Sequence, residues 1–254
     1  MPVDLAIRKT LSAGGRTFTL DVRLASAARR IAVVGPSGGG KSLTLKAVAG
    51  LIRPDEGHIR VNGVTWFDAQ QRIDLPPRLR RGGYLFQDYA LFPHLNVRQN
   101  IAFGLDGGGR WFNPRARVHG DALDYWLGAF DLEALGSLFP HQLSGGQRQR
   151  VALARTLVVQ PHILLLDEPF AAVDALLRER MREELNRLQR ELDIPMILIT
   201  HDPLDAEVLA DEVFHLLDGA ITGSGEGWNA PGQSARGQCI DLPAHGGQPG
   251  NRLP

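Results

Sequence analysis

The sequence predicts an α/β fold that opens with an antiparallel β unit and carries an inserted helical unit. Residues 5–24 alternate or cluster apolar side chains around Gly14 and Gly15, which is typical of a β-hairpin. Residues 163–166 form a short, wholly apolar run, as in a buried strand. Between them, apolar side chains recur at helical spacing over residues 88–160. Strand patterns on both sides of a helical stretch favour an α/β core with a helical insertion.

A strand, a glycine-rich turn and a helix follow the hairpin directly. Residues 31–34 are apolar and run straight into glycine, and residues 41–51 carry leucine and valine at helical spacing. Pro54 and Gly57 end this unit. A second apolar run at residues 196–199 predicts one more buried strand of the same core.

Composition limits the kinds of partner. Of the 254 residues, 43% are hydrophobic and 22% charged, which suits one large domain or a core with a subdomain. The 28 Lys and Arg residues balance the 28 Asp and Glu residues, so no broad basic surface indicates a nucleic acid or an anionic membrane as partner. We therefore expect specific protein or small-molecule contacts and no nucleic acid.

Cellular setting and domain limits follow from four further features. The single cysteine, Cys239, cannot form an internal disulfide, and the N-terminus lacks a signal-peptide layout. No apolar run approaches the roughly 18 to 20 residues of a membrane-spanning helix, so we expect a cytosolic chain whose membrane partners would cross the bilayer. After about Gly219 the chain is rich in Gly, Pro, Gln and Ser, which predicts one domain over residues 1–223 and a disordered tail over 224–254.

A phosphate-binding loop is predicted between the first apolar strand and the following helix. Its residues match the pattern G-x-x-x-x-G-K-[ST]. The loop's N–H groups and the helix N-terminus would bind phosphate oxygens, the lysine would neutralise the β- and γ-phosphates, and the serine would ligate Mg²⁺. The flanking strand and helix disfavour the alternative, a plain glycine turn with a solvated lysine. The residues assigned to ATP are Gly35, Pro36, Ser37, Gly38, Gly39, Gly40, Lys41 and Ser42.

Two carboxylates follow the apolar run at 163–166. They would lie at the C-terminal edge of the sheet, where α/β folds bind ligands. Asp167 is predicted to hold Mg²⁺, directly or through water, and Glu168 to polarise the attacking water as a general base. An exposed acidic turn is the alternative reading, and the nearby phosphate loop disfavours it.

A second small-residue turn precedes another helical pattern. Ser144, Gly145, Gly146 and Gln147 could present N–H groups and a helix N-terminus to a phosphate. The same residues are also typical of an ordinary capped helix N-terminus. The pattern alone does not decide between a phosphate-binding turn and a helix cap.

Together these motifs resemble the nucleotide-binding domain of ABC transporters, over about residues 5–219. Leu143 to Gln147 match the family's signature, and the phosphate loop, Gln87, the signature, Asp167-Glu168, Asp174 and His201 stand in the family's order. The resemblance implies a P-loop NTPase core with an antiparallel β subdomain and a helical subdomain at about residues 88–160.

The resemblance also implies partners and roles. Two copies would bind head to tail and hold each ATP between the phosphate loop of one and the signature turn of the other. Gln87 would ligate Mg²⁺ or water, Asp174 would communicate across the dimer, and His201 would contact the γ-phosphate. Without the resemblance, His201 would be read as an ordinary structural histidine.

Adenine recognition departs from the family pattern. The hairpin turn over residues 11–17 has none of the aromatic side chains on which relatives commonly stack the base. Phe18 is the nearest aromatic residue and is assigned to ATP as a possible cover for the base, with a core position as the alternative.

Residues 66–97 resemble importer ATPases, closest to those of molybdate uptake, although such ATPases usually add a β-rich regulatory domain that the 224–254 tail is too short to form. The resemblance implies integral membrane permease subunits, an indirect periplasmic or extracellular substrate-binding protein, and a place on the cytoplasmic face of the inner membrane. Tyr89, Leu91 and Phe92 would contact the permease or form local core. Sulfate, iron or polyamine import remains an alternative, as does a soluble ABC ATPase without membrane partners.

Overall fold

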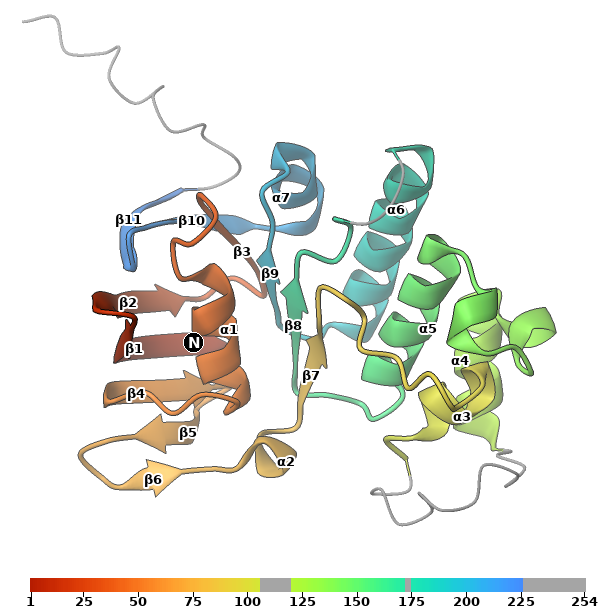
Figure 1. The fold of residues 1–254 in the computed structure, drawn as a ribbon, viewed down its shortest axis with the longest axis horizontal. Helices are drawn as coiled ribbons and strands as arrows, with labels where there is room; N and C mark the ends of the chain where they lie inside the picture. Colours follow the sequence, from red (N-terminus) through yellow and green to blue (C-terminus); the bar gives the residue numbers. More distant parts are fainter. Residues whose placement is uncertain (106–119, 172–174, 226–254) are drawn as a thin grey trace, which may run out of the picture.

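The computed structural model describes residues 1–105, 120–171 and 175–225, in which an 11-stranded sheet is flanked by helices (Figure 1). The strands are β1 (Val3–Ala13), β2 (Arg16–Ser26), β3 (Arg30–Val34), β4 (Glu56–Val61), β5 (Val64–Asp68), β6 (Ile73–Asp74), β7 (Gly82–Leu85), β8 (Ile163–Asp167), β9 (Met196–Ile199), β10 (Glu212–Leu217) and β11 (Ala220–Gly225). The helices are α1 (Lys41–Ala49), α2 (Pro77–Arg80), α3 (Val97–Ala102), α4 (Asp121–Ala129), α5 (Gly145–Leu157), α6 (Ala175–Leu192) and α7 (Pro203–Leu209), with 3-10 turns η1 (Glu133–Leu135) and η2 (Pro140–Gln142).

The sheet has an antiparallel part and a parallel part. Its strand order is β6-β5-β4-β1-β2-β11-β10-β3-β9-β8-β7. Strands β6 to β2 in this order are antiparallel, whereas β10, β3, β9, β8 and β7 run parallel. Strand β11 joins the parts, since it pairs antiparallel to β10 and parallel to β2. Figure 1 shows the antiparallel strands on one side of α1 and the helices α3 to α6 on the far side of β8.

The predicted N-terminal hairpin is present. Strands β1 and β2 pair along their whole length, from Val3 opposite Ser26 to Ala13 opposite Arg16. Gly14 and Gly15 make the turn with φ values of 55° and 78°, a backbone region that glycine occupies at little cost.

Strand β8 separates two cores because its side chains alternate between the faces of the sheet. Leu164 and Leu166 pack with the helices α3 to α6, whereas Ile163 and Leu165 pack with α1 and the antiparallel strands. A strand buried on both faces must be apolar at every position, which explains the unbroken run that predicted it.

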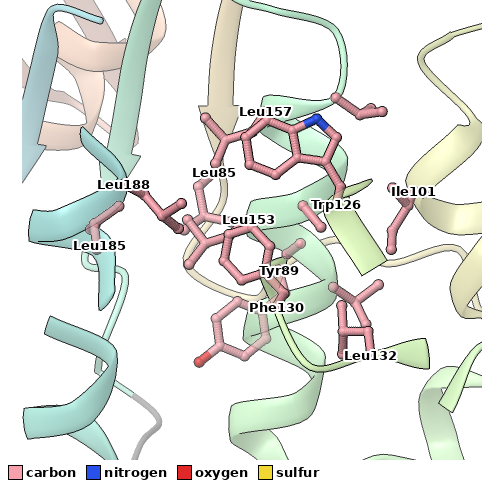
Figure 2. Packing of buried hydrophobic residues seen from close by; sticks show 14 of the residues in the cluster. Leu85, Tyr89, Ile101, Trp126, Phe130, Leu132, Leu153, Leu157, Leu185 and Leu188 are labelled. Carbon is pink, nitrogen blue, oxygen red and sulfur yellow. The ribbon is translucent and has the colours of Figure 1, made fainter. Parts of the chain in front are cut away.

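The helical side has a dense apolar core, shown in Figure 2. Trp126 of α4, Leu153 of α5 and Leu185 of α6 are each at most 6% exposed and belong to the same cluster. Tyr89 is also part of it, at 4% exposed, so of its two sequence readings the structure supports the local core.

A buried arginine ties α2 to the far end of α1. Arg80 is 1% exposed and donates to the carbonyls of Ala47 and Val48 at 2.8 Å each, to Leu75 O at 2.7 Å and to Asp74 at 3.1 Å. These bonds give the carbonyls at the end of α1 a buried donor, in addition to the Gly50 N–H that Ala47 O also accepts, and so help to fix the helix that begins at the phosphate loop.

The predicted end of the domain at residue 223 falls inside a strand. Strand β11 continues to Gly225 because its backbone pairs with β10, and such pairing needs few aliphatic side chains. Residues 226–254, and with them Cys239 and nearly all of the predicted tail, lie outside the described residues, as do Gly107 to Gly109 and Pro114 of the predicted insertion.

No helix in the described ranges combines the length and the apolar character that crossing a bilayer requires.

Candidate nucleotide-binding site

The loop from β3 to α1 needs glycine at two positions for different reasons. Gly35 has φ +151°, and a Cβ there would lie 2.0 Å from the carbonyl oxygen of Leu216. Gly40 has φ +102°, and a Cβ there would meet Leu20 Cδ1 at 2.6 Å. The loop therefore winds tightly between β10 and β2, with the N-terminus of α1 at its end.

Lys41 lies along this loop. It is 6% exposed, and its Nζ donates to the carbonyls of Gly35 and Pro36 at 2.9 Å each. Both acceptors are neutral, so they satisfy the donors without neutralising the charge. A nearly buried ammonium group held in this way is suited to an anion that brings the compensating charge.

A hydroxyl and a carboxylate from separate elements meet beside the loop. Ser42 Oγ at the start of α1 donates to Asp167 Oδ1 at the end of β8, at 2.9 Å. Tyr84 of β7 donates its hydroxyl to the other oxygen, Oδ2, at 3.1 Å. Asp167 is 5% exposed, so both of its oxygens are engaged inside the protein.

Glu168 and His201 face each other from neighbouring strands. Their side chains approach to 3.4 Å between Glu168 Oε2 and His201 Nδ1. Glu168 has φ 47°, an uncommon backbone conformation for a non-glycine residue, and its N–H donates to Ile199 O at 3.0 Å. Such strain persists only where neighbouring contacts hold it, and it often marks functional positions.

Behind His201 a buried network fixes the backbone. Thr200 Oγ1 donates to Asp205 at 2.8 Å and accepts the Asp202 N–H at 3.0 Å. Arg182 of α6 donates twice to Asp205, at 2.9 and 2.6 Å. The residues on either side of His201 are thus tied to α6 and α7.

Gln87 lies in the same cleft as the Ser42 and Asp167 pair. This open cleft of about 650 Å³ is lined by Ser42, Lys46, Phe86, Gln87, Asp88, Asp167 and Ala171.

The side chains in this cleft fit Mg²⁺ in donor type. Ser42, Gln87 and Asp167 supply hydroxyl, amide and carboxylate oxygens, which suit this hard cation. In the described ranges no cluster of three or more His, Cys, Asp or Glu forms a complete protein cage.

The turn at Ser144 is bonded mainly to itself. Ser144 Oγ accepts the Gln147 N–H at 3.3 Å, and Gln147 Oε1 accepts the Ser144 N–H at 2.8 Å, which together form a capping box for α5. Neither residue lines the cleft of Ser42 and Asp167, and Figure 1 shows α1 and α5 separated by β7 and β8. The two predicted phosphate-binding turns therefore lie apart within one chain.

Comparison with known proteins decides the family. A model of the family described as "ABC transporter" matches residues 20–171. The chain belongs to the ABC transporter family. This agrees with the family suspected from the motifs, and the fold agrees with the predicted P-loop NTPase class.

Curated members of the ABC family include several similar proteins. A sulfate/thiosulfate import ATP-binding protein from Synechocystis is 47% identical over 191 residues, covering 75% of this chain and 51% of the relative. A molybdate/tungstate import ATP-binding protein from Archaeoglobus fulgidus is 44% identical over 214 residues and covers 82% of each chain. A Fe(3+) ions import ATP-binding protein from Pseudomonas fluorescens is 44% identical over 216 residues, covering 84% of this chain and 58% of the relative. The chain thus spans about half the length of several relatives that it matches.

Solved ABC cassettes share the fold. A dimeric post-hydrolysis state of the cassette MJ0796 bound to ADP and Pi has a TM-score of 0.72 at 29% identity, covering 88% of this chain and 98% of that chain. A second dimeric structure of the same cassette gives a TM-score of 0.72 at 28% identity.

The structure brings some of the residues predicted from the sequence together and leaves others apart. Ser42, Gln87 and Asp167 share one cleft, and Glu168 and His201 form a close pair. Phe18 is half-buried against the core beneath α1, and its ring would lie 3.1 Å from a Cβ at Gly40, so it sits beside the phosphate loop. Asp174 lies outside the described residues.

Sequence reasoning missed Tyr84 and the pair Arg182 and Asp205. Tyr84 stands in an ordinary strand pattern, and only the pairing of β7 with β8 brings its hydroxyl to Asp167. Asp205 lies on the short helix α7, which begins two residues after His201, and only the fold brings it to Thr200 and to Arg182 of α6.

Proposed function

We propose that this chain is the ATP-binding and hydrolysing subunit of an ABC importer. The observation that carries the proposal is the 2.9 Å contact between Ser42 of the phosphate loop and Asp167 of β8. Glu168 comes directly after β8 and pairs with His201, which lies two residues after the neighbouring strand β9. A triphosphate-binding loop, a carboxylate for the metal and a second carboxylate for water are the parts that phosphoryl transfer to water requires.

Each residue has a separate task in this proposal. Lys41 and the loop N–H groups bind the β- and γ-phosphates. Ser42, Gln87 and Asp167 hold Mg²⁺, which supplies charge neutralisation on the phosphate oxygens. Glu168 accepts the proton of the attacking water.

His201 contacts the γ-phosphate, and its 3.4 Å approach to Glu168 keeps the two groups close together.

A second copy of the chain completes the site in this proposal. Ser144 is exposed at the N-cap of α5, and neither Ser144 nor Gln147 lines the chain's own cleft. In a head-to-tail dimer, Ser144, Gly145, Gly146 and Gln147 of one copy would bind the phosphates held by the other, and Asp174 would communicate between the copies. The dimeric form of the similar cassette MJ0796 supports a dimer in general.

The import direction and the substrate are the finer parts of the proposal. The similar curated proteins are import ATP-binding proteins, two of them for oxyanions, sulfate/thiosulfate and molybdate/tungstate. We assign molybdate or a related oxyanion as the substrate, taken up through separate membrane permease subunits with a substrate-binding protein outside. The chain would then work at the cytoplasmic face of the inner membrane, and Fe³⁺, sulfate or polyamine import is the alternative.

Reconstitution tests this function. The chain would be combined with its permease in vesicles, and ATP hydrolysis measured with a binding protein loaded with molybdate, with sulfate or with neither. Stimulation by molybdate alone supports the full proposal, and stimulation by sulfate alone replaces the substrate. Hydrolysis that is indifferent to permease and binding protein would contradict the importer function and favour a soluble ABC ATPase.

A further inference from the structure

Tyr84 contacts the carboxylate of Asp167, which is proposed to hold Mg²⁺. The proposed function gives Tyr84 itself no role. Its hydroxyl lies 3.1 Å from Asp167 Oδ2, opposite the oxygen that accepts from Ser42 at 2.9 Å. The carboxylate is therefore held from both sides, by one donor on α1 and one on β7.

The surroundings of the Tyr84 ring fix this donor in place. Strand β7 pairs in parallel with β8, with Tyr84 opposite Leu165, two residues before Asp167. The ring packs against Phe86, with centroids 4.5 Å apart, and against the core beneath α1. A phenol in such packing has little rotational freedom, so its hydroxyl defines a nearly fixed point next to Asp167.

At neutral pH a phenol is protonated, so Tyr84 donates in this bond and the carboxylate of Asp167 accepts.

We propose that Tyr84 is a positioning residue for the metal site: its hydroxyl holds Asp167 Oδ2 so that Oδ1 stays directed at Ser42 and at the cation. This rests on the proposed function, in which Asp167 and Ser42 hold Mg²⁺. A free aspartate can rotate about its side-chain bonds, and a bond to one oxygen removes much of that freedom before the metal arrives. The effect should appear as metal affinity, because Tyr84 touches neither the phosphate loop nor the Glu168 and His201 pair in any described hydrogen bond.

Tyr84→Phe tests the proposal because it removes the hydroxyl and keeps the ring in its packing. Binding of a fluorescent ATP analogue is measured in EDTA and then across a MgCl₂ titration, so that the readout does not depend on turnover. We expect unchanged nucleotide affinity in EDTA and an increase of about 10-fold in the Mg²⁺ concentration that gives half of the metal-dependent effect, the size expected for losing one hydrogen bond to a charged group.

A matched control shows whether loss of any tyrosine hydroxyl has the same effect as loss of the one beside Asp167. Tyr125→Phe removes an equivalent hydroxyl from a side chain that is 57% exposed and should leave the Mg²⁺ titration unchanged. In an Asp167→Ala background, Tyr84→Phe should add no further change, since the group on which it acts is gone.

Two results would overturn the positioning role. One is a Mg²⁺ midpoint for Tyr84→Phe within about twofold of wild type, given that a bond of this kind is worth about 10-fold. The other is an equal loss of affinity in EDTA, which would assign the effect to packing of the cleft. Failure of the proposed function would look different, because the wild-type chain itself would then bind no nucleotide or show no response to Mg²⁺.

Discussion

The edge of the parallel sheet and the start of α5 were both predicted to bind phosphate, and their internal bonding differs. At the sheet edge, side chains from separate parts of the chain contact one another: Ser42 of α1 with Asp167 of β8, Asp167 with Tyr84 of β7, and Glu168 after β8 with His201 after β9. At the start of α5 the bonds run between Ser144 and Gln147, two residues of the same helical turn.

This difference teaches which part of the site one chain assembles alone. Groups that are mutually bonded and buried are held in position before any ligand arrives, at no further ordering cost. The capped N-terminus of α5 is locally complete and does not line the chain's own cleft, so its role in catalysis depends on what another molecule presents to it. The sheet edge thus forms most of the proposed ATP site within one chain. The α5 turn would add the remaining contacts from a second chain.

The largest expected effect comes from breaking the sheet edge at Glu168. Glu168→Gln keeps the size and the hydrogen-bonding capacity of the side chain but removes its basicity. We expect ATP hydrolysis to fall at least about 100-fold, the usual contribution of a general base, while ATP binding persists and an ATP-bound dimer accumulates. Steady-state hydrolysis and light scattering with ATP measure the two effects.

Glu191→Gln is the matched control for that variant. Glu191 forms an exposed ion pair with Arg187 one helical turn away, and such pairs contribute little. Its hydrolysis should match wild type. Normal turnover in Glu168→Gln would remove Glu168 from the role of base.

An intermediate effect tests whether the two regions act in trans. Lys41→Ala should lose most ATP affinity, and Ser144→Arg should block the α5 turn, so each variant alone should be inactive. When the two variants are mixed in equal amounts, half of the head-to-tail dimers contain one copy of each. Each mixed dimer has one intact site, because the normal phosphate loop of one copy faces the normal α5 turn of the other. Hydrolysis should then recover to about a quarter of wild type if the sites act independently.

The control for this mixing experiment is each variant mixed with itself at the same total concentration. No recovery in the mixture would indicate that phosphate loop and α5 turn act within one chain or require both sites intact. A mixture of wild type with each variant distinguishes those two explanations, because only the second makes one inactive copy silence its partner.

The smallest expected effect comes from Ser144, whose contribution to the stability of α5 can be measured separately from its contribution to ATP hydrolysis. Ser144→Ala removes the side chain that caps α5 and should lower the free energy of unfolding by about 1 kcal/mol. Asn96→Ala is its match, because Asn96 and Gln99 form the same capping box on α3. Denaturant unfolding should give similar losses for both.

ATP hydrolysis then distinguishes the two caps. Only Ser144→Ala should reduce turnover of the chain without its permease, by more than its stability loss explains. Equal turnover of the two variants would leave the α5 turn with a capping role alone.

Prediction from sequence succeeded where the signal is local. The hairpin at Gly14 and Gly15 and the apolar run of β8 depend on alternation and turn chemistry within a few residues. The domain end predicted at residue 223 falls inside β11 for the opposite reason. Strand β11 is polar and glycine-rich, and it is ordered by pairing with β10, a partner that composition does not reveal.

The candidate site divides in the same way. The phosphate-loop motif consists of consecutive residues, so the roles of Lys41 and Ser42 could be proposed from the sequence alone. Tyr89 shows the limit, because its aromatic side chain suited an outer contact equally well until the fold placed it in the helical core.

By itself, the sequence determined the family, the order of the elements and the chemical identity of the proposed catalytic groups, because these depend on short motifs and on hydrophobic period. Only the tertiary structure decided which groups meet. The contact of Tyr84 with Asp167 depends on the parallel pairing of β7 with β8, two strands that lie about 80 residues apart along the chain. Hydrogen bonds act over about 3 Å, and sequence spacing does not specify distances between side chains on separate strands at that scale.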